Sequence, residues 1–214
     1  MTSEMLSALM KGIAVGIVIA LPVGPVGVLC VRRTLFQGPT YGFVSGLGAA
    51  LADTIFGVIA GFGLTFVRDY LIGHQDWFGA AGGAFLLVLG VNALRNAEDI
   101  EPEPVDGEAR LAAFASTFAL TITNPVTIFA FAGIFAKIGL ANGAGYFATG
   151  VLITGVFLGS LLWWLVLSFG IAGLRRMIGR IRLVWLNRIS GVILAASGLA
   201  LLTAALFAAV GIKL

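Results

Sequence analysis

Six long stretches of the chain consist almost entirely of apolar residues, and short polar segments separate them. A helix that crosses a bilayer needs about 20 mostly apolar residues. Residues 12–31, 41–66, 77–94, 111–136, 145–171 and 184–211 each form such a stretch. The pattern therefore predicts an all-α membrane protein with six transmembrane helices.

The composition agrees with this class and narrows the chemistry. Hydrophobic residues make up 59% of the chain and charged residues 11%, whereas soluble domains carry about 25% charged residues. The single cysteine, Cys30, excludes a disulfide within the chain and a thiolate zinc site. The single histidine, His74, excludes a histidine-rich metal site. We therefore expect no enzyme, no cofactor, no resident metal and no nucleic-acid partner.

Basic residues in the loops predict the orientation, because Lys and Arg are enriched in cytoplasmic loops. Six spans divide these residues between two sides. One side holds Lys11, Arg68, Lys137 and Lys213, and the other holds Arg32, Arg33, Arg95, Arg110, Arg175, Arg176, Arg180, Arg182 and Arg188. The second side is predicted to be cytoplasmic. Both termini then lie outside a bacterial plasma (inner) membrane.

An internal repeat relates the two halves of the chain. Prolines interrupt both the first and the fourth span, at 22–25 and at 124–125. Paired glycines seven residues apart recur in the third span, at 83 and 90, and in the sixth, at 191 and 198. Each copy has three spans, so the second copy enters the membrane from the opposite side. We predict a 3+3 inverted repeat, the architecture of many secondary transporters, in which residues 97–110 form an acidic cytoplasmic linker between repeats 1–96 and 111–214.

The two interruptions predict a binding site near the middle of the membrane. Proline removes a backbone donor and clashes with the preceding turn, so the helix breaks. The N–H groups that begin the second half of a broken helix carry partial positive charge and can hold a carboxylate. The candidate residues are Gly24, Pro25, Val26, Asn124, Pro125 and Thr127. The alternative is a plain proline kink that neighbouring helices stabilise.

Asp53 lies near the centre of the second span, where an ionisable residue is costly and usually functional. Its carboxyl group could bind and release a coupling proton, or pair with a substrate ammonium group. The alternative is a structural aspartate that hydrogen-bonds to Thr54, Ser45 or Asn124. Because Asp53 lies at the depth of both interruptions, we expect it to face the same site.

Several other polar and aromatic residues have two interpretations. Trp163 and Trp164 are expected to anchor the fifth span at the membrane interface, with a pocket wall as the alternative. Arg32 and Arg33 end the first span and are expected to fix its orientation, with attraction of an anionic substrate as the alternative. Pairs of glycines four apart favour close helix packing, either within one chain or in a homodimer.

These residues together resemble the LysE (lysine exporter) type family of amino-acid exporters. The resemblance rests on the run 22–27 (PVGPVG), on the spacing Gly42-x3-Gly46-x-Gly48-x4-Asp53, and on the segment 123–128 (TNPVTI). Val126 departs from it, because many relatives carry a basic residue after Asn-Pro. The resemblance implies a six-span inner-membrane protein that exports amino acids with an ion gradient. It places functional residues at Gly24, Pro25, Asp53, Asn124 and Pro125.

The expected function is therefore secondary active export of amino acids or similar small zwitterions by alternating access, coupled to protons through Asp53. The partners are the amino acid, the coupling ion and the lipid bilayer. Two alternatives stay open at this point: an inverted-repeat exporter of divalent metal ions, and a membrane assembly protein that transports nothing.

Overall fold

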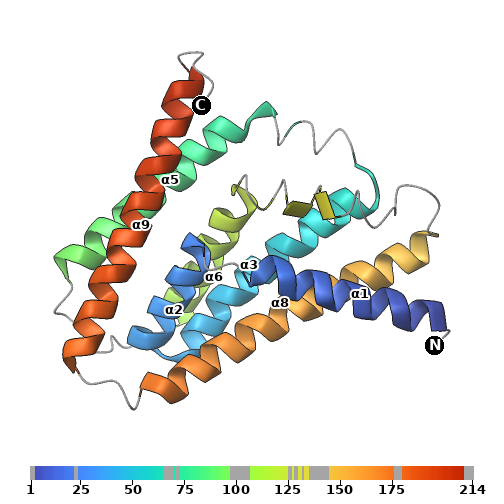
Figure 1. Ribbon diagram of the computed structural model, residues 1–214, viewed down its shortest axis with the longest axis horizontal. Coiled ribbons are helices and arrows are strands. Elements are labelled where there is room, and N and C mark those ends of the chain that lie inside the picture. Colours follow the sequence, from blue (N-terminus) through green and yellow to red (C-terminus); the bar gives the residue numbers. More distant parts are fainter. Residues whose placement is uncertain are drawn as a thin grey trace.

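The computed structural model describes residues 3–21, 24–64, 70, 73–96, 107–124, 127, 130–131, 133–134, 145–175 and 180–209 (Figure 1). Helices dominate these residues, and no strand occurs among them. The helices are α1 (Ser3–Ala20), α2 (Pro25–Gln37), α3 (Pro39–Gly61), α5 (Gln75–Arg95), α6 (Gly107–Ile122), α8 (Tyr146–Arg175) and α9 (Arg180–Ala209). The prediction of an all-α protein is confirmed for this part of the chain.

Five of these helices, α1, α3, α5, α8 and α9, are long and apolar enough to cross a membrane. Helices α2 and α6 have 13 and 16 residues and are too short to cross a bilayer by themselves. α1 and α2 together cover the predicted first span, and α6 covers the beginning of the predicted fourth. The count of six spans stays a prediction.

Several predicted boundaries differ from the observed helices, among them the starts of α1 and α6. α1 begins at Ser3, well before the expected start at Gly12, because hydropathy detects only the apolar part of a helix that continues through Glu4 and Lys11. α6 begins at Gly107, inside the segment 97–110 that was predicted to be a linker. Residues 97–106 of that segment lie outside the described part of the chain.

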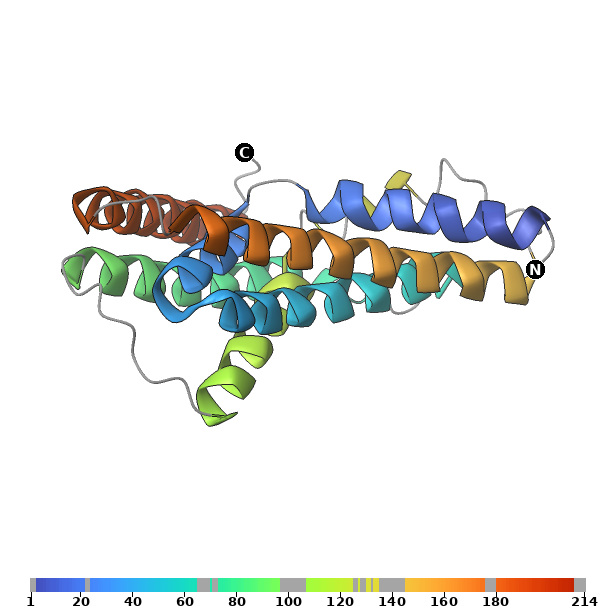
Figure 2. The same ribbon diagram turned by 90° about the horizontal axis from the view of Figure 1, so that it is seen from below.

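Glycines hold α1 and α8 together along their length, and Figure 2 shows the two helices side by side. A methyl group at Gly12 would collide with the backbone of Leu152, and one at Gly16 with that of Val156. Gly155 and Gly159 face α1 in the same way. The residue numbers of the contact partners increase together along both helices, so α1 and α8 run parallel. These two glycine pairs therefore pack within one protomer.

Helices α5 and α9 form a second tightly packed pair, at the left of Figure 1. Gly83 approaches the backbone of Gly198, and Gly90 approaches that of Gly191. The residue numbers of the contact partners fall on one helix as they rise on the other, so this pair is antiparallel. The glycines that suggested a sequence repeat are thus contact partners of one another.

Helix α3 lies at the centre and packs against both α6 and α8. A methyl group at Gly48 would collide with the backbone of Phe114 on α6, and one at Gly46 with the Trp164 side chain on α8. Further along, the Phe56 ring packs against that of Phe131, with centroids 5.8 Å apart. α3 and the chain from α6 onward therefore run parallel, and α3 is in contact with both halves of the sequence.

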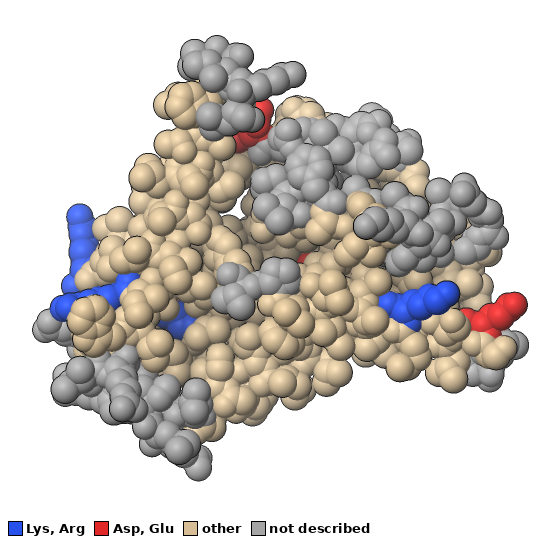
Figure 3. Space-filling view, in the orientation of Figure 1, with Lys and Arg blue, Asp and Glu red and all other residues tan. Residues whose placement is uncertain are grey.

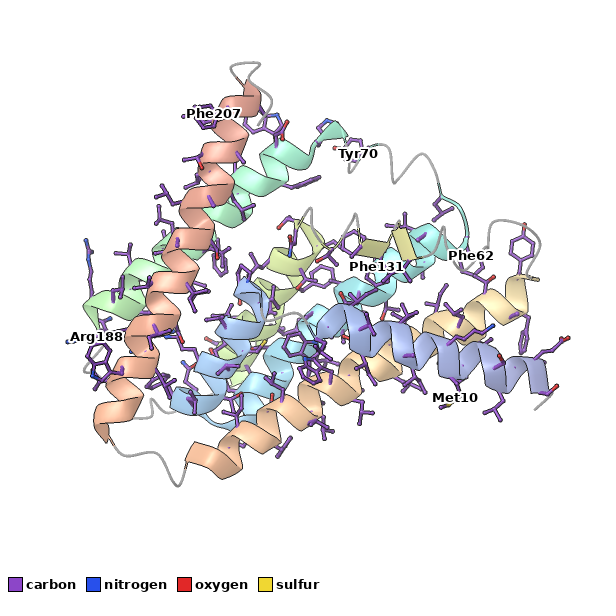
Figure 4. All side chains as sticks on the ribbon, in the orientation of Figure 1. Met10, Phe62, Tyr70, Phe131, Arg188 and Phe207 are labelled. Atoms are coloured by element: carbon purple, nitrogen blue, oxygen red, sulfur yellow. The ribbon has the colours of Figure 1, made fainter. Side chains whose placement is uncertain are left out.

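The ends of α2 and α5 and the beginning of α9 meet at one end of the bundle. Arg32 Nε donates to Asn187 Oδ1 at 2.7 Å, and Asn187 Nδ2 donates to the Asn96 carbonyl at 3.4 Å. Figure 4 shows Arg188 at this end of α9 and Phe207 at the other, and much of the basic surface in Figure 3 lies at the Arg188 end. The beginnings of α1 and α8 and the end of α9 lie on the opposite side. The loops that were predicted to share a side are therefore close in space.

Candidate functional site

The chain leaves the helical conformation between α1 and α2. α1 ends at Ala20, and Gly24 is extended, with φ −87° and ψ −173°, before α2 begins at Pro25. Gly24 provides no side-chain cap for α2, and Pro25 has no backbone N–H. The amide of Val28 is the first to bond within the helix, to the Gly24 carbonyl at 3.0 Å. The amides of Val26 and Gly27 therefore have no acceptor within α2.

The backbone conformation also changes after α6. The helix ends at Ile122, and the Asn124 amide donates to the Thr121 carbonyl at 3.1 Å, which closes a tight turn. The Asn124 carbonyl then accepts from the Thr127 amide at 3.1 Å. Pro125 and Val126 lie outside the described residues, so the prediction for Pro125 stays untested.

Asp53 is buried on α3, with 3% of its surface exposed. Its Oδ2 atom accepts a hydrogen bond from the Ser160 hydroxyl on α8 at 2.8 Å. Two of the partners considered for a structural Asp53 make other hydrogen bonds: Thr54 donates to the Ala50 carbonyl and Ser45 to the Tyr41 carbonyl. Asp53 is thus linked to a helix of the other sequence half, and no Lys or Arg in the described chain forms a salt bridge with it.

A cavity of about 620 Å³ lies where these features meet. Figure 3 shows a hollow near the middle of this face, with acidic atoms visible inside it. Six of the seven predicted site residues line the cavity: Gly24, Pro25, Val26, Asp53, Asn124 and Thr127. The two backbone interruptions and the buried carboxylate therefore share one cavity, whereas the sequence indicated only that they lie at a similar depth. Their role in binding stays a prediction.

Trp164 is a wall of this cavity, and the expectation of an interface anchor was wrong for it. Its side chain is only 3% exposed, and its indole Nε1 has no hydrogen-bond partner in the described chain. Gly46 on α3 leaves the room that the indole occupies. Trp164 follows Ser160, the hydrogen-bond donor to Asp53, by one helical turn, and this spacing is the sequence signal that both side chains lie on the face of α8 that packs against α3.

Arg33 is also buried, at 8% exposure, which the sequence did not predict. Its Nη1 atom donates to Ser45 Oγ at 3.1 Å, to the Ala113 carbonyl at 3.0 Å and to Thr117 Oγ1 at 2.7 Å. Its Nη2 atom donates to Ser116 Oγ at 2.8 Å. One guanidinium group therefore ties α2 to α3 and α6. Arg33 does not line the cavity, so its observed role is to hold these helices together.

The described residues contain no group of three or more His, Cys, Asp or Glu side chains that could hold a metal ion. The polar groups around the cavity are one carboxylate, one amide and several hydroxyls. This set suits a small polar solute with an ammonium group, since the carboxylate can pair with it. The helix start at Val26 suits a negatively charged group.

The chain resembles known proteins along most of its length. The model of the LysE type translocator family matches residues 17–205. A Bacillus subtilis protein named "Putative amino acid efflux protein YcgF" is 27% identical over 200 residues, which cover 87% of this chain and 90% of the relative. No solved structure matches the chain. The family match includes both interruptions and every residue that lines the cavity, and this chain is therefore a member of the LysE type translocator family, a family of multi-pass membrane transporters.

Proposed function

We propose that this protein exports amino acids, or similar small zwitterions, across the bacterial plasma membrane. The observation that carries the proposal is the buried Asp53 carboxylate in a cavity bordered by Gly24–Val26 and by Asn124. The name of the Bacillus subtilis relative supports the same substrate class. A zwitterion needs one negative and one positive partner a few ångströms apart, and the cavity offers both kinds.

Asp53 receives the substrate ammonium group in this proposal. The substrate carboxylate binds at the start of α2, where the amides of Val26 and Gly27 point out of the helix with partial positive charge. Thr127 also lines the cavity, and its hydroxyl group offers a second donor there, since its amide is bonded to the Asn124 carbonyl. Half-helix starts of this kind hold substrate carboxylates in other transporters with inverted repeats.

Alternating access is proposed to follow from a 3+3 inverted repeat, with the first repeat in 1–96 and the second in 111–214. The packing supports this symmetry. The parallel pair α1 and α8 has its counterpart in the parallel pair α6 and α3, while the antiparallel pair α5 and α9 would map onto itself. Such an arrangement is expected when three helices are repeated with opposite orientation.

A proton is the proposed coupling ion. Asp53 can carry it because a carboxyl group in a cavity is exposed to each side of the membrane in turn. The Ser160 hydroxyl donates to Asp53 Oδ2 at 2.8 Å, and so holds the carboxyl group that would receive a proton or an ammonium group in one position. Substrate and proton would then use the same carboxylate in alternation, which couples their movements.

The proposed orientation puts the end with Arg32, Arg95 and Arg188 in the cytoplasm and both termini outside. Hydrogen bonds bring the loops at this end together, which supports a common side for them.

Efflux from preloaded cells tests the proposal. Cells that overproduce the chain are fed dipeptides that deliver each of the twenty amino acids in turn. We expect faster efflux of one or a few of them, its loss when a protonophore is added, and its loss in Asp53→Asn. Asp76→Asn is the matched control, because Asp76 is exposed in the first turn of α5 and does not line the cavity.

Two results would contradict the proposal. If no amino acid leaves faster although the protein is present in the membrane, export of amino acids is wrong, and divalent cations become the next substrates to test. If Asp53→Asn transports like the unmodified protein, Asp53 has no part in coupling or binding.

A further inference from the structure

The cavity wall is chemically divided into two parts. Most of its polar side chains come from α3, from the end of α6 and from the residues after it, namely Asp53, Thr121, Thr123, Asn124 and Thr127, and α9 adds Ser197. Most of the remaining wall is apolar, and it is formed by α1, α5, α6, α8 and α9 through Ile19, Phe78, Leu86, Leu120, Trp164 and Leu201. The cavity can therefore hold the zwitterionic head group of a substrate at its polar side chains and an apolar substrate side chain in a separate compartment.

Asp53 is the only charged residue among the described residues that line the cavity. A lysine or arginine substrate has two positive charges to place, and a glutamate substrate has two negative charges. In either case one charge would lie against the apolar wall without a partner, and burying an unpaired charge is strongly unfavourable. The wall thus discriminates against charged side chains.

The size of the cavity discriminates against small substrates. A volume of about 620 Å³ is within the usual range for small-molecule sites and far exceeds what the head group of an amino acid fills. A substrate such as serine would leave the apolar compartment unused and gain little from it. Burial of apolar surface is the favourable contribution that this compartment can make.

We infer that the substrate is a neutral amino acid with a large apolar side chain, branched aliphatic or aromatic, and that the face of α5 containing Phe78, Gly82 and Leu86 contacts this side chain. The inference rests on the proposed function and names the substrate class of the same site.

Gly82 permits a direct test. It lines the cavity, and a methyl group there would lie 3.5 Å from Thr123 Oγ1 and 3.7 Å from Leu120 Cδ1, which are ordinary contact distances. Gly82→Ala should therefore fold normally while it narrows the side-chain compartment. Gly79→Ala is the matched control on the same helix, because a methyl group at Gly79 meets no atom within 4 Å and Gly79 does not line the cavity.

The experiment measures efflux of leucine, phenylalanine, alanine, serine, lysine and glutamate from cells with each variant at equal membrane abundance. In the unmodified protein we expect leucine or phenylalanine to leave fastest. Gly82→Ala should lower the preference for phenylalanine over alanine by roughly tenfold, the usual effect of one methyl group in an apolar substrate pocket. Gly79→Ala should leave that preference unchanged.

The outcomes separate this inference from the function on which it rests. Fastest efflux of lysine, glutamate or serine overturns the inference and leaves amino-acid export in place. Equal effects of Gly82→Ala and Gly79→Ala on the preference also overturn it. If the dipeptide screen described above shows export of none of the twenty amino acids, the proposed function and the inference both fail.

Discussion

Arg33 offers a quantitative test of how the helices are held together. Its two terminal nitrogens donate four hydrogen bonds to acceptors on α3 and α6. In Arg33→Lys the charge remains, but one ammonium nitrogen cannot occupy both the Nη1 and Nη2 positions, so the bond to Ser116 and one further bond are lost. A hydrogen bond to a charged group stabilises by about 1.5–3 kcal/mol. We expect the free energy of unfolding to fall by about 3 kcal/mol.

Thermal unfolding of the purified protein in detergent measures this effect. A loss of about 3 kcal/mol should lower Tm by roughly 6–12 °C in a chain of this size. Arg95→Lys is the matched control, since Arg95 is exposed in the last turn of α5. If Arg33→Lys and Arg95→Lys have the same Tm, the four hydrogen bonds do not stabilise the bundle, and our account of Arg33 is wrong.

Three further predictions concern the site, the packing and the orientation. Ser160→Ala removes the hydroxyl that donates to the buried carboxylate and should slow proton-coupled efflux by roughly ten- to a hundredfold, whereas Ser160→Thr keeps the hydroxyl and most of the rate. Rates alike in the two variants would contradict this. Gly159→Leu collides with the α1 backbone and should leave little folded protein by size-exclusion chromatography, while Gly170→Leu, where a methyl group meets no atom within 4 Å, should fold; equal yields would refute the glycine contact. The residue in Tyr146→Cys should react with an impermeant maleimide in intact cells, and that in Trp185→Cys only after permeabilisation. Both native side chains are well exposed, so the reverse pattern would invert the predicted orientation.

The sequence predicted the features that depend on local composition. The lengths of the apolar stretches predict where the membrane helices lie, and α3 and α5 begin within two residues of the expected positions. Glycine and proline around position 24 predicted a site near the first interruption, and the chain is non-helical at Gly24. Asp53 was identified because a charge is costly in an apolar span. Each of these signals can be read without knowing which helices touch.

What the sequence could not predict depends on contacts between distant helices. Arg33 resembles any basic residue at a membrane boundary until its acceptors on α6, some 80 positions later, are known. Trp164 resembles an interface anchor until Gly46 on α3 is seen to make room for it. The partners considered for Asp53 were Thr54, Ser45 and Asn124, whereas the observed donor is Ser160, 107 positions away. Which side chains contact one another depends on the fold, and hydropathy along the chain carries no information about it.

The close packing of α1 on α8 has a consequence for how the chain is made. Gly16 contacts Val156, so about 140 further residues must be synthesised before α1 can meet its partner. At 5–20 residues per second, the ribosome needs roughly 7–28 s for this. During that time the small-residue face of α1 has only lipid or the insertion machinery against it. A shorter delay applies to α5, because Gly83 meets Gly198 only after about 115 further residues are made. The first half of the chain should therefore be short-lived when it is produced alone, and co-production of the second half should rescue it.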